Sequence, residues 1–425
     1  MKFALKVIVV FLIVFNFRLP YVYNSVLLSI ILSTIYYWRK GRSIPLYSFL
    51  QKYNGAILIG TILMLLVSFF FIYIHASSEY LYLKRYCLIL MMNFAAIYAL
   101  PLLIGGKEDH ALEEVIKVIV YTFALQGLIH TAGYIYTPFG EYILNTFNPN
   151  VAHFISTGGS QIDRFRCYAL CGSIFFELPA AYGVAFILFF RLHLIENQKY
   201  ITGWMSYIIF TLMFLGVMLS GRTGFVGIAI SLAYYMYFSW KKIKVQLVNL
   251  WKAIRMYLVL LVAFYFLLPP DTRKGFEQDV FPFAFEFYYN YRDRGRLSTA
   301  STDKLNTAMY YSLDEDTIWL GHGVFSNNSK YPQSDAGYIN NLVYGGIPFF
   351  LCLIIYQMLY FSRPLFMSSQ GRLRQDEMDL YLFASLLVYI FILNYKSTSL
   401  GSIHCVMAMY LLIGSSYITR YYAKE

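Results

Sequence analysis

Apolar runs close to twenty residues long recur along almost the whole chain. A helix needs about 20 apolar residues to cross a bilayer core about 30 Å thick. Of the 425 residues, 59% are hydrophobic and 13% are charged, whereas about 25% of the residues in a soluble domain are charged. The sequence therefore predicts an all-α membrane protein that forms a single polytopic domain over residues 1–425.

The apolar runs define about twelve predicted transmembrane helices. They cover residues 4–17, 22–38, 56–74, 86–104, 115–135, 173–192, 201–219, 223–239, 253–269, 340–361, 379–395 and 401–418. An even number of crossings places both termini on the same side of the membrane.

The net charge of +11 does not require a nucleic-acid partner. Short cytoplasmic loops of membrane proteins are enriched in Lys and Arg. With a cytoplasmic N-terminus, the basic clusters at 39–42, 241–255 and 363–374 all fall inside. We therefore predict a multi-pass protein of the cell inner membrane with cytoplasmic termini and no nucleic-acid partner.

Two segments on the predicted outer face, 137–172 and 270–340, are too long to be simple connectors. We predict that they cover an active site. An aromatic stretch, Phe281–Tyr291, suits the membrane interface. A short amphipathic helix should follow, with apolar residues at helical spacing: Leu305, Ala308, Met309 and Leu313.

Arginines occur on the predicted outer side, where few basic residues are expected. Arg222 is the sharpest case, because it lies in a turn between two apolar helices in the sequence SGRTG. A guanidinium at membrane depth costs several kcal/mol unless it is paired or faces water. For Arg222 the alternative is an arginine that snorkels from a helix end, and for the run from Arg292 to Arg296 it is a solvated charged face. The outer arginines are Arg164, Arg166, Arg222, Arg292, Arg294 and Arg296.

Arginines gathered at an outer membrane surface suit a lipid-linked pyrophosphate. The planar guanidinium binds phosphate oxygens in a bidentate way and keeps its charge. Such a lipid would hold its tail in the bilayer and its sugar outside, and arginines would stabilise charge on the departing pyrophosphate. The outer loops contain no HExxH zinc-binding pattern. We therefore predict neither a metal nor another cofactor.

A transfer to a sugar hydroxyl also needs a base. The catalytic candidates are Asp335, in SDAGY before an apolar helix, His322, between two glycines, and Glu177, inside an apolar run. Each has a structural alternative. Asp335 suits a helix N-cap, His322 suits a turn, and Glu177 suits an ion pair with an outer arginine.

Three ordered segments resemble the O-antigen polymerase and O-antigen ligase superfamily of membrane glycosyltransferases. RFRCYALCGSIFFELPAAYG is similar to the family's Arg-x-x-Gly…Pro helix, MLSGRTGFVGIAI to its Ser-Arg-Thr-Gly turn, and LGHGVFSN…SDAGYINNLVYGGIPFF to its closing Gly-Ile segment. The resemblance implies a C-type glycosyltransferase fold and a metal-free reaction on undecaprenyl-pyrophosphate-linked glycans at the periplasmic face. It also implies pyrophosphate-binding roles for Arg222, Arg166 and Arg296, which match the family's turn, helix and late-loop arginines.

The resemblance favours the polymerase branch. Ligases of this group typically carry a His-Asn pair before the closing glycine, whereas this chain has Asp335 and Ala336. A polymerase would transfer a growing glycan onto a new lipid-linked repeat unit, with Tyr338 on the acceptor side. The alternatives are a ligase that transfers the glycan to a lipid A core, and a flippase or transporter of lipid-linked oligosaccharide.

A polymerase also implies partners and a route for its substrates. The partners would be the undecaprenyl-pyrophosphate-linked oligosaccharide, membrane lipid and a polysaccharide chain-length regulator. Both lipid tails would enter sideways, near the helices that start at Gly172 and end at Ser220.

Overall fold

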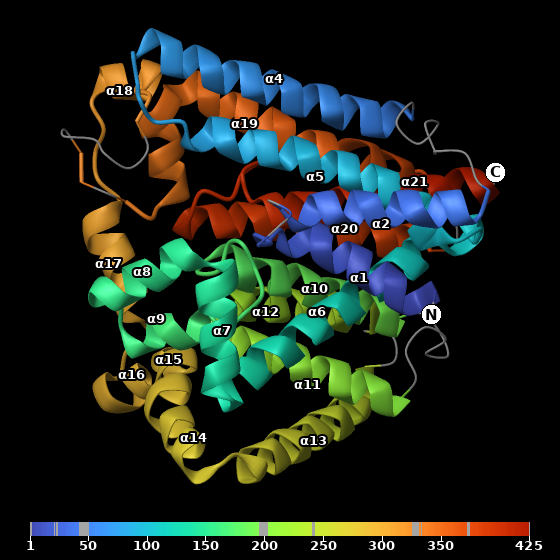
Figure 1. Cartoon of the computed structure of the whole chain (residues 1–425), viewed down its shortest axis with the longest axis vertical. Helices are drawn as coiled ribbons and strands as arrows, with labels where there is room; N and C mark the ends of the chain where they lie inside the picture. The colour runs from blue at the N-terminus through green and yellow to red at the C-terminus, as the bar shows by residue number, and fades with distance from the viewer. Residues whose placement is uncertain are drawn as a thin grey trace.

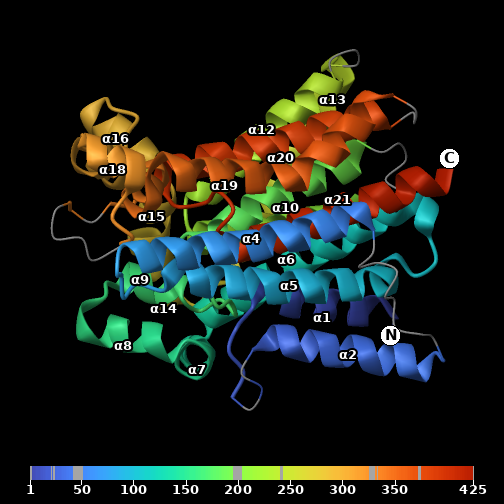
Figure 2. The same cartoon turned by 90° about the horizontal axis from the view of Figure 1, so that it is seen from above.

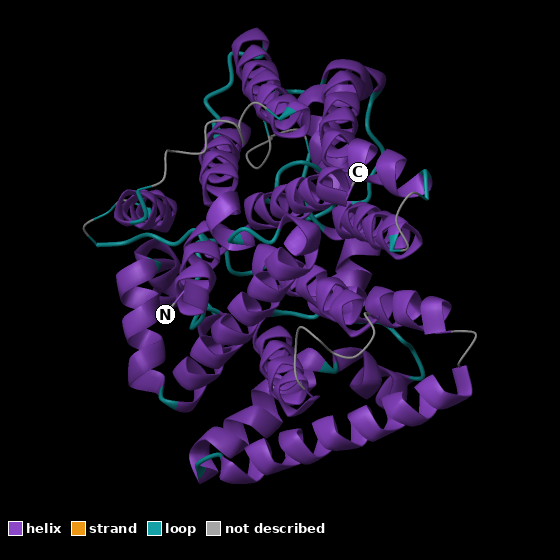
Figure 3. Cartoon of the chain, turned by 90° about the vertical axis from the view of Figure 1, so that its right-hand side faces the viewer, coloured by secondary structure: helices purple, strands orange, loops and turns teal. Residues whose placement is uncertain are grey.

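The computed structural model describes residues 2–20, 22, 24–41, 51–194, 203–239, 243–324, 331–332, 334–371 and 375–424. Helices account for all the regular secondary structure of these residues, which contain no strand (Figure 3). The predicted all-α fold is therefore confirmed.

Each predicted apolar segment overlaps one long helix of the described chain. These helices are α1 (Lys2–Phe15), α2 (Ser25–Arg39), α4 (Lys52–Ile74), α5 (Leu81–Ile104), α6 (Ala111–Ile135), α10 (Glu177–Leu194), α11 (Gly203–Ser220), α12 (Thr223–Ser239), α13 (Ile243–Leu267), α19 (Gly337–Ser369), α20 (Asp376–Lys396) and α21 (His404–Lys424). Among the described residues, seven helices are long and apolar enough to cross a membrane, namely α4, α5, α6 with the turn before it, α10, α11, α19 and α20. The chain is a multi-pass, membrane-embedded protein.

The long helices run side by side, and the short helices gather at one end of the bundle (Figures 1 and 2). We call this the loop end. Both termini lie at the opposite end, which we call the termini end. The helices of the loop end are α7 (Thr137–Phe147), α8 (Pro149–Gly158), α9 (Gln161–Arg166), α14 (Pro270–Gly275), α15 (Phe281–Ala284), α16 (Glu286–Arg294), α17 (Ala300–Lys304) and α18 (Glu315–Leu320), with π-helical turns at Phe276–Val280 and Leu305–Met309.

Glycines allow two pairs of long helices to pack with almost touching backbones. A Cβ atom at Gly227 of α12 would lie 2.2 Å from the Cα of Gly183 in α10. A Cβ atom at Gly127 of α6 would lie 2.1 Å from the carbonyl oxygen of Leu212 in α11. Small residues commonly permit such close packing between membrane helices. Gly183 and Gly227 therefore bring α10, which follows Arg166, against α12, which follows Arg222.

A chain of hydrogen bonds links α4, α5 and α19 inside the bundle. The Thr61 hydroxyl lies 2.8 Å from the Tyr356 hydroxyl, and Asn93 Nδ2 donates to Thr61 at 3.1 Å and to the Tyr360 hydroxyl at 3.2 Å. All four side chains are buried. Polar side chains that bond across helices hold membrane bundles together, so these tyrosines contribute to internal packing.

Helix α19 is broken near its start, inside the predicted 340–361 span. Gly345 departs from helical geometry, and Gly346 has φ 61°, a left-handed conformation that glycine adopts without strain. The His322 N–H donates to the carbonyl of Val343, just before the break, at 2.7 Å. The break therefore docks the loop that carries His322 onto the start of α19.

The predicted amphipathic helix forms, but it is shorter than the spacing suggested. It comprises α17 and the π-helical turn that ends at Met309, so Leu313 lies beyond its end. Its buried apolar residues form a small cluster with the start of α19: Leu305, Met309, Ala336, Ile339 and Val343.

Four charged side chains are buried together near the termini end. Arg191 of α10 donates to Asp379 of α20 from Nε at 2.9 Å and from a terminal nitrogen at 2.6 Å. Arg420 of α21 donates to Glu113 of α6 at 2.7 Å and also bonds Asp379. No side chain of the four is more than 2% exposed. Two cations and two anions thus join four long helices in a charge-balanced cluster.

Candidate anion-binding cavity

A cavity of about 280 Å³ at the loop end gathers residues from distant parts of the chain. It holds three basic side chains and one carboxylate, together with aromatic and hydroxyl groups. Its lining consists of Arg166, Phe175, Phe176, Gly221, Arg222, Thr223, Phe283, Ser301, Asp335, Lys396 and Ser397. Three of the residues predicted from the sequence, Arg166, Arg222 and Asp335, therefore meet at one cavity.

Arg166 is held in place by backbone carbonyls. It ends the short helix α9, whose start is fixed by a capping box between Ser160 and Asp163. Its Nε donates to the carbonyl of Ser220 at 2.9 Å, and a terminal nitrogen donates to the carbonyl of Phe175 at 2.7 Å. A weaker ion pair joins it to Asp163 at 3.7 Å. Because two of its bonds go to neutral carbonyls, Arg166 keeps most of its positive charge available to the cavity.

Arg222 lies in the turn between α11 and α12, as the SGRTG pattern predicts. One terminal nitrogen forms an ion pair with Glu286 of α16, and the other donates to the Ser301 hydroxyl at 3.2 Å. Its guanidinium and that of Arg166 each lie 5.2 Å from the ring centre of Phe283. The Phe283 ring therefore forms a shared floor beneath both cations, at a distance that allows cation–π attraction.

The two guanidinium groups are crowded together with little solvent. Each side chain is 17% exposed. Burial lowers the pKa of Arg166, and burial together with the positive charge of Arg166 lowers the pKa of Arg222. Arginine nevertheless stays protonated in proteins. The crowding costs free energy that a bound anion would recover, so the cavity favours an anionic ligand.

Lys396, at the end of α20, is the third cation of the cavity. Its Nζ donates to the Ser301 hydroxyl at 3.3 Å, so the same oxygen accepts from both Lys396 and Arg222. The sequence analysis missed this lysine. The sequence pattern that singled out Arg222 also applies to Lys396, because this lysine follows an apolar run on the predicted outer side. Glu286, Ser301 and Phe283 carried no such signal, since each sits in a loop-end helix whose packing the pattern does not determine.

Asp335 is the only one of the three predicted bases that lines the cavity. Its side chain is exposed, and its backbone N–H contacts the sulfur of Met309 at 3.3 Å. The N-cap residue of α19 is Ala336, and no side-chain hydrogen bond caps this helix. The Asp335 carboxylate is therefore not used as a helix cap and stays open to the cavity.

Glu177 is the first residue of α10, and its side chain lies against the start of α21 rather than in the cavity. Its carboxylate lies 3.0 Å from Nδ1 of His404, at the start of α21. The sequence analysis predicted an arginine partner as the structural alternative, and the observed close partner is a histidine. Glu177 does not line the cavity.

His322 and Tyr338 also lie outside the cavity lining. His322 is half-buried, with Nε2 2.7 Å from the Thr317 hydroxyl. The Tyr338 hydroxyl donates to the backbone carbonyl of Phe391 in α20 at 3.0 Å. Both polar groups thus take part in contacts that hold the loop end and α19 in place.

The other predicted arginines lie away from the cavity. Arg164 donates to Glu141 at 2.6 Å, and this bond raises the pKa of Arg164 and lowers that of Glu141. Arg292 pairs with its neighbour Asp293 at 2.8 Å, where both side chains are exposed. Two further arginines are exposed and do not line the cavity: Arg294 and Arg296.

An apolar groove of about 530 Å³ lies beside the cavity. The two are linked through α15, because Phe283 lines the cavity whereas Phe281 and Phe285 line the groove. Met218 of α11 also lines the groove, two residues before the end of that helix. The remaining lining residues are apolar side chains and Tyr265 from α11, α13 and the π-helical turn after α14: Phe214, Leu215, Leu258, Leu261, Val262, Phe264, Tyr265, Phe266 and Phe276.

Comparison with known proteins gives no match. No protein family matches the chain, and neither does any curated protein or solved structure. Within the described residues, no group of three or more His, Cys, Asp or Glu side chains is arranged to hold a metal ion. The resemblance described above therefore rests on the three sequence motifs.

Proposed function

We propose that the protein is a membrane glycosyltransferase that polymerises an O-antigen or capsular polysaccharide. The donor is a growing glycan on undecaprenyl pyrophosphate, and the acceptor is a new lipid-linked repeat unit. The observation that carries this proposal is the meeting of Arg166, Arg222 and Lys396 with the open carboxylate of Asp335 at one cavity. Cations beside a free carboxylate match the two needs of glycosyl transfer, a stabilised leaving group and a base.

In the proposed reaction, one bond forms and one breaks. The acceptor hydroxyl oxygen bonds to C1 of the donor sugar, while the bond from C1 to the pyrophosphate oxygen breaks. The lipid pyrophosphate leaves with the bonding electron pair, and Arg166, Arg222 and Lys396 stabilise its negative charge. Asp335 takes the proton of the hydroxyl.

The apolar groove supports a lipid-linked ligand over a soluble phosphate. A prenyl tail gains free energy by lying on apolar side chains, and the groove begins at the same short helix, α15, that floors the cavity. Its wall includes the end of α11, close to the lateral opening predicted at Ser220. An anionic head with an apolar tail would fill both spaces.

The proposal also fixes an orientation and a number of crossings. The twelve long helices would each cross the membrane, with the termini end in the cytoplasm. Basic residues near that end, such as Arg39, Lys40 and Arg363, agree with the enrichment of positive charge in cytoplasmic loops. The loop end and its cavity would then face the periplasm.

Surface-glycan gels of a strain that lacks this protein test the function. A lost polymerase leaves lipid A core that carries a single repeat unit, and the full ladder returns with the intact gene. Bare core with lipid-linked glycan accumulated on the periplasmic side would instead identify a ligase. Lipid-linked repeat units trapped on the cytoplasmic side would identify a flippase, so either result contradicts the proposal.

Asp335→Asn should lower the rate of polymerisation about 10²- to 10⁴-fold, the usual contribution of a general base. The amide keeps the size of the side chain but cannot take a proton. The rate is measured with purified protein in liposomes that contain a lipid-pyrophosphate-linked repeat unit. Asp316→Asn is the matched control, because Asp316 is exposed at the same end and does not line the cavity. Near-normal turnover by Asp335→Asn would exclude it as the base.

Glu286→Gln should tighten binding of inorganic pyrophosphate about five- to tenfold. Glu286 competes with a bound anion for Arg222. Removal of one negative charge about 7 Å from the anion, at an effective dielectric constant of about 40, is worth about 1 kcal/mol for each unit of charge on the anion, so a gain of about five- to tenfold is the smallest change expected. Calorimetry of the purified protein measures the affinity. Weaker binding would mean that Glu286 mainly holds Arg222 in position.

A further inference from the structure

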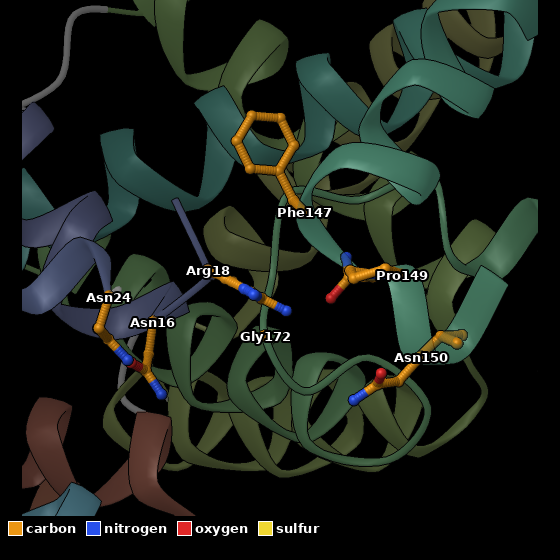
Figure 4. A pocket seen from close by; sticks show the side chains of 9 residues that line it. Asn16, Arg18, Asn24, Phe147, Pro149, Asn150 and Gly172 are labelled. Atoms are coloured by element: carbon orange, nitrogen blue, oxygen red, sulfur yellow. The ribbon is translucent and has the colours of Figure 1, made fainter. Parts of the chain in front are cut away.

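A second polar cavity, of about 420 Å³, lies between the α1–α2 loop and the α7–α8 turn (Figure 4). It is separate from the cationic cavity, and the proposed chemistry does not use it. Its lining is rich in asparagine: Asn16, Arg18, Asn24, Phe147, Asn148, Pro149, Asn150, Val151 and Gly172. None of these residues is acidic, and the only charged one is Arg18.

Two buried amides of this cavity have unused hydrogen-bonding groups. Asn16 is 6% exposed and Asn148 is 7% exposed. Asn16 Oδ1 and Asn148 Nδ2 are shielded from solvent and have no hydrogen-bond partner among the described residues. Leaving such a group unpaired costs about 1–3 kcal/mol. One unpaired acceptor and one unpaired donor call for a ligand that both donates and accepts hydrogen bonds.

The walls of the cavity are fixed by contacts that do not involve these groups. The Ser25 N–H donates to the carbonyl of Phe17 at 2.9 Å, and the Phe17 N–H donates to the Ser25 hydroxyl at 3.1 Å. The Phe17 ring packs edge-on against Phe147, with ring centres 5.6 Å apart. Asn16 has φ 41°, a left-handed conformation that asparagine tolerates better than most residues. These contacts therefore hold the α1–α2 loop against the end of α7 at one side of the cavity.

Arg18 extends its guanidinium across the cavity toward Pro149 and Asn150 (Figure 4). Its side chain is exposed. Together with the asparagines, it offers several hydrogen-bond donors and acceptors around a space of ligand size. Each hydroxyl group of a saccharide both donates and accepts hydrogen bonds. Asparagine amides can satisfy both roles, so a saccharide does not require an acidic side chain here.

The second cavity lies close to the cationic one. The Gly172 N–H donates to the carbonyl of Phe15 at 2.8 Å, and a Cβ atom at this position would lie 2.1 Å from the carbonyl oxygen of Asn16. Phe175, three residues later, lines the cationic cavity. Three residues of chain span at most about 11 Å. An oligosaccharide held at its reacting end in the cationic cavity would therefore reach the second cavity with a following sugar.

We propose that the asparagine-rich cavity binds a saccharide unit of the glycan and thereby selects the repeat unit. This inference rests on the proposed function, because it assumes that the cationic cavity holds the pyrophosphate end of the same class of substrate.

Two probes separate the two sites in the full-length protein held in lipid nanodiscs. One is the lipid-free oligosaccharide repeat unit, released by mild acid from its lipid-pyrophosphate carrier, and the other is inorganic pyrophosphate. Asn148→Leu and Arg18→Gln should each weaken oligosaccharide binding at least about tenfold, or about 1.4 kcal/mol, with unchanged pyrophosphate binding. Arg222→Ala should do the reverse.

The outcomes distinguish failure of this inference from failure of the proposed function. If wild-type protein does not bind the oligosaccharide, or if both cavity variants bind it normally, the inference is wrong, whatever the pyrophosphate result. If Arg222→Ala binds pyrophosphate normally, the proposed function loses its main support. Should Asn148→Leu fail to fold, the exposed Arg18→Gln decides alone.

Discussion

Arg222→Ala should lower the rate of glycan polymerisation about 10²- to 10³-fold, the cost of removing one group that stabilises transition-state charge. Arg166→Ala should have an effect of similar size, because both guanidinium groups line the cavity over the same Phe283 ring. The rate is measured in liposomes with a lipid-pyrophosphate-linked repeat unit, and chain length is read from gels of the product. Arg222→Lys should recover only part of the rate, because a lysine keeps the charge but loses the planar fork.

Lys274→Ala is the control for the arginine variants. Lys274 is an exposed cation in α14 at the loop end and does not line the cavity. It should polymerise normally, which excludes a general effect of lost positive charge at this end. If cells with only Arg222→Ala still made glycan chains of full length, the pyrophosphate-binding role would be wrong.

Asp379→Asn should destabilise the protein by about 3–5 kcal/mol, the usual cost of breaking a buried ion pair. The change leaves Arg191 and Arg420 buried with Glu113 as their only remaining anion in the four-residue cluster. Both arginines bond Asp379 in the wild-type protein. The measurement is the melting temperature in detergent, followed by size-exclusion chromatography of heated samples.

The double variant Arg191→Met/Asp379→Asn tests whether charge balance is the cause. It removes one cation and one anion and keeps the 2.7 Å pair between Arg420 and Glu113, so it should melt above Asp379→Asn. Asp109→Asn, an exposed acid at the termini end, should melt as the wild-type protein does. A double variant that melts below Asp379→Asn would show that the cluster acts through packing and not through charge balance.

The sequence predicted the long helices well because a single physical requirement, the apolar length of a membrane span, determines them. It placed Arg222 in the turn that the structure contains, because glycines and a charge between two apolar runs mark a turn. The helices of the loop end were not predictable in the same way. Their packing depends on contacts such as that of Glu286 with Arg222, which join residues far apart in sequence.

The candidate site was predictable only in part for the same reason. Arg166, Arg222 and Asp335 stood out as charges beside apolar segments, and the structure brings them to one cavity. Arg296 had the same sequence signal but is exposed outside that cavity. A charge pattern identifies the end of the bundle at which a residue lies, whereas the direction of its side chain depends on tertiary contacts.

The alternating phenylalanines of α15 have a consequence for how a lipid substrate would travel. Phe283 lies under the cations, whereas Phe281 and Phe285 line the apolar groove. The boundary between the cationic cavity and the apolar groove thus runs through a single helical turn. In the proposed reaction, a carrier lipid would shift its phosphates only by the width of that turn to enter the cationic cavity. Its tail would stay on the apolar side chains of the groove throughout.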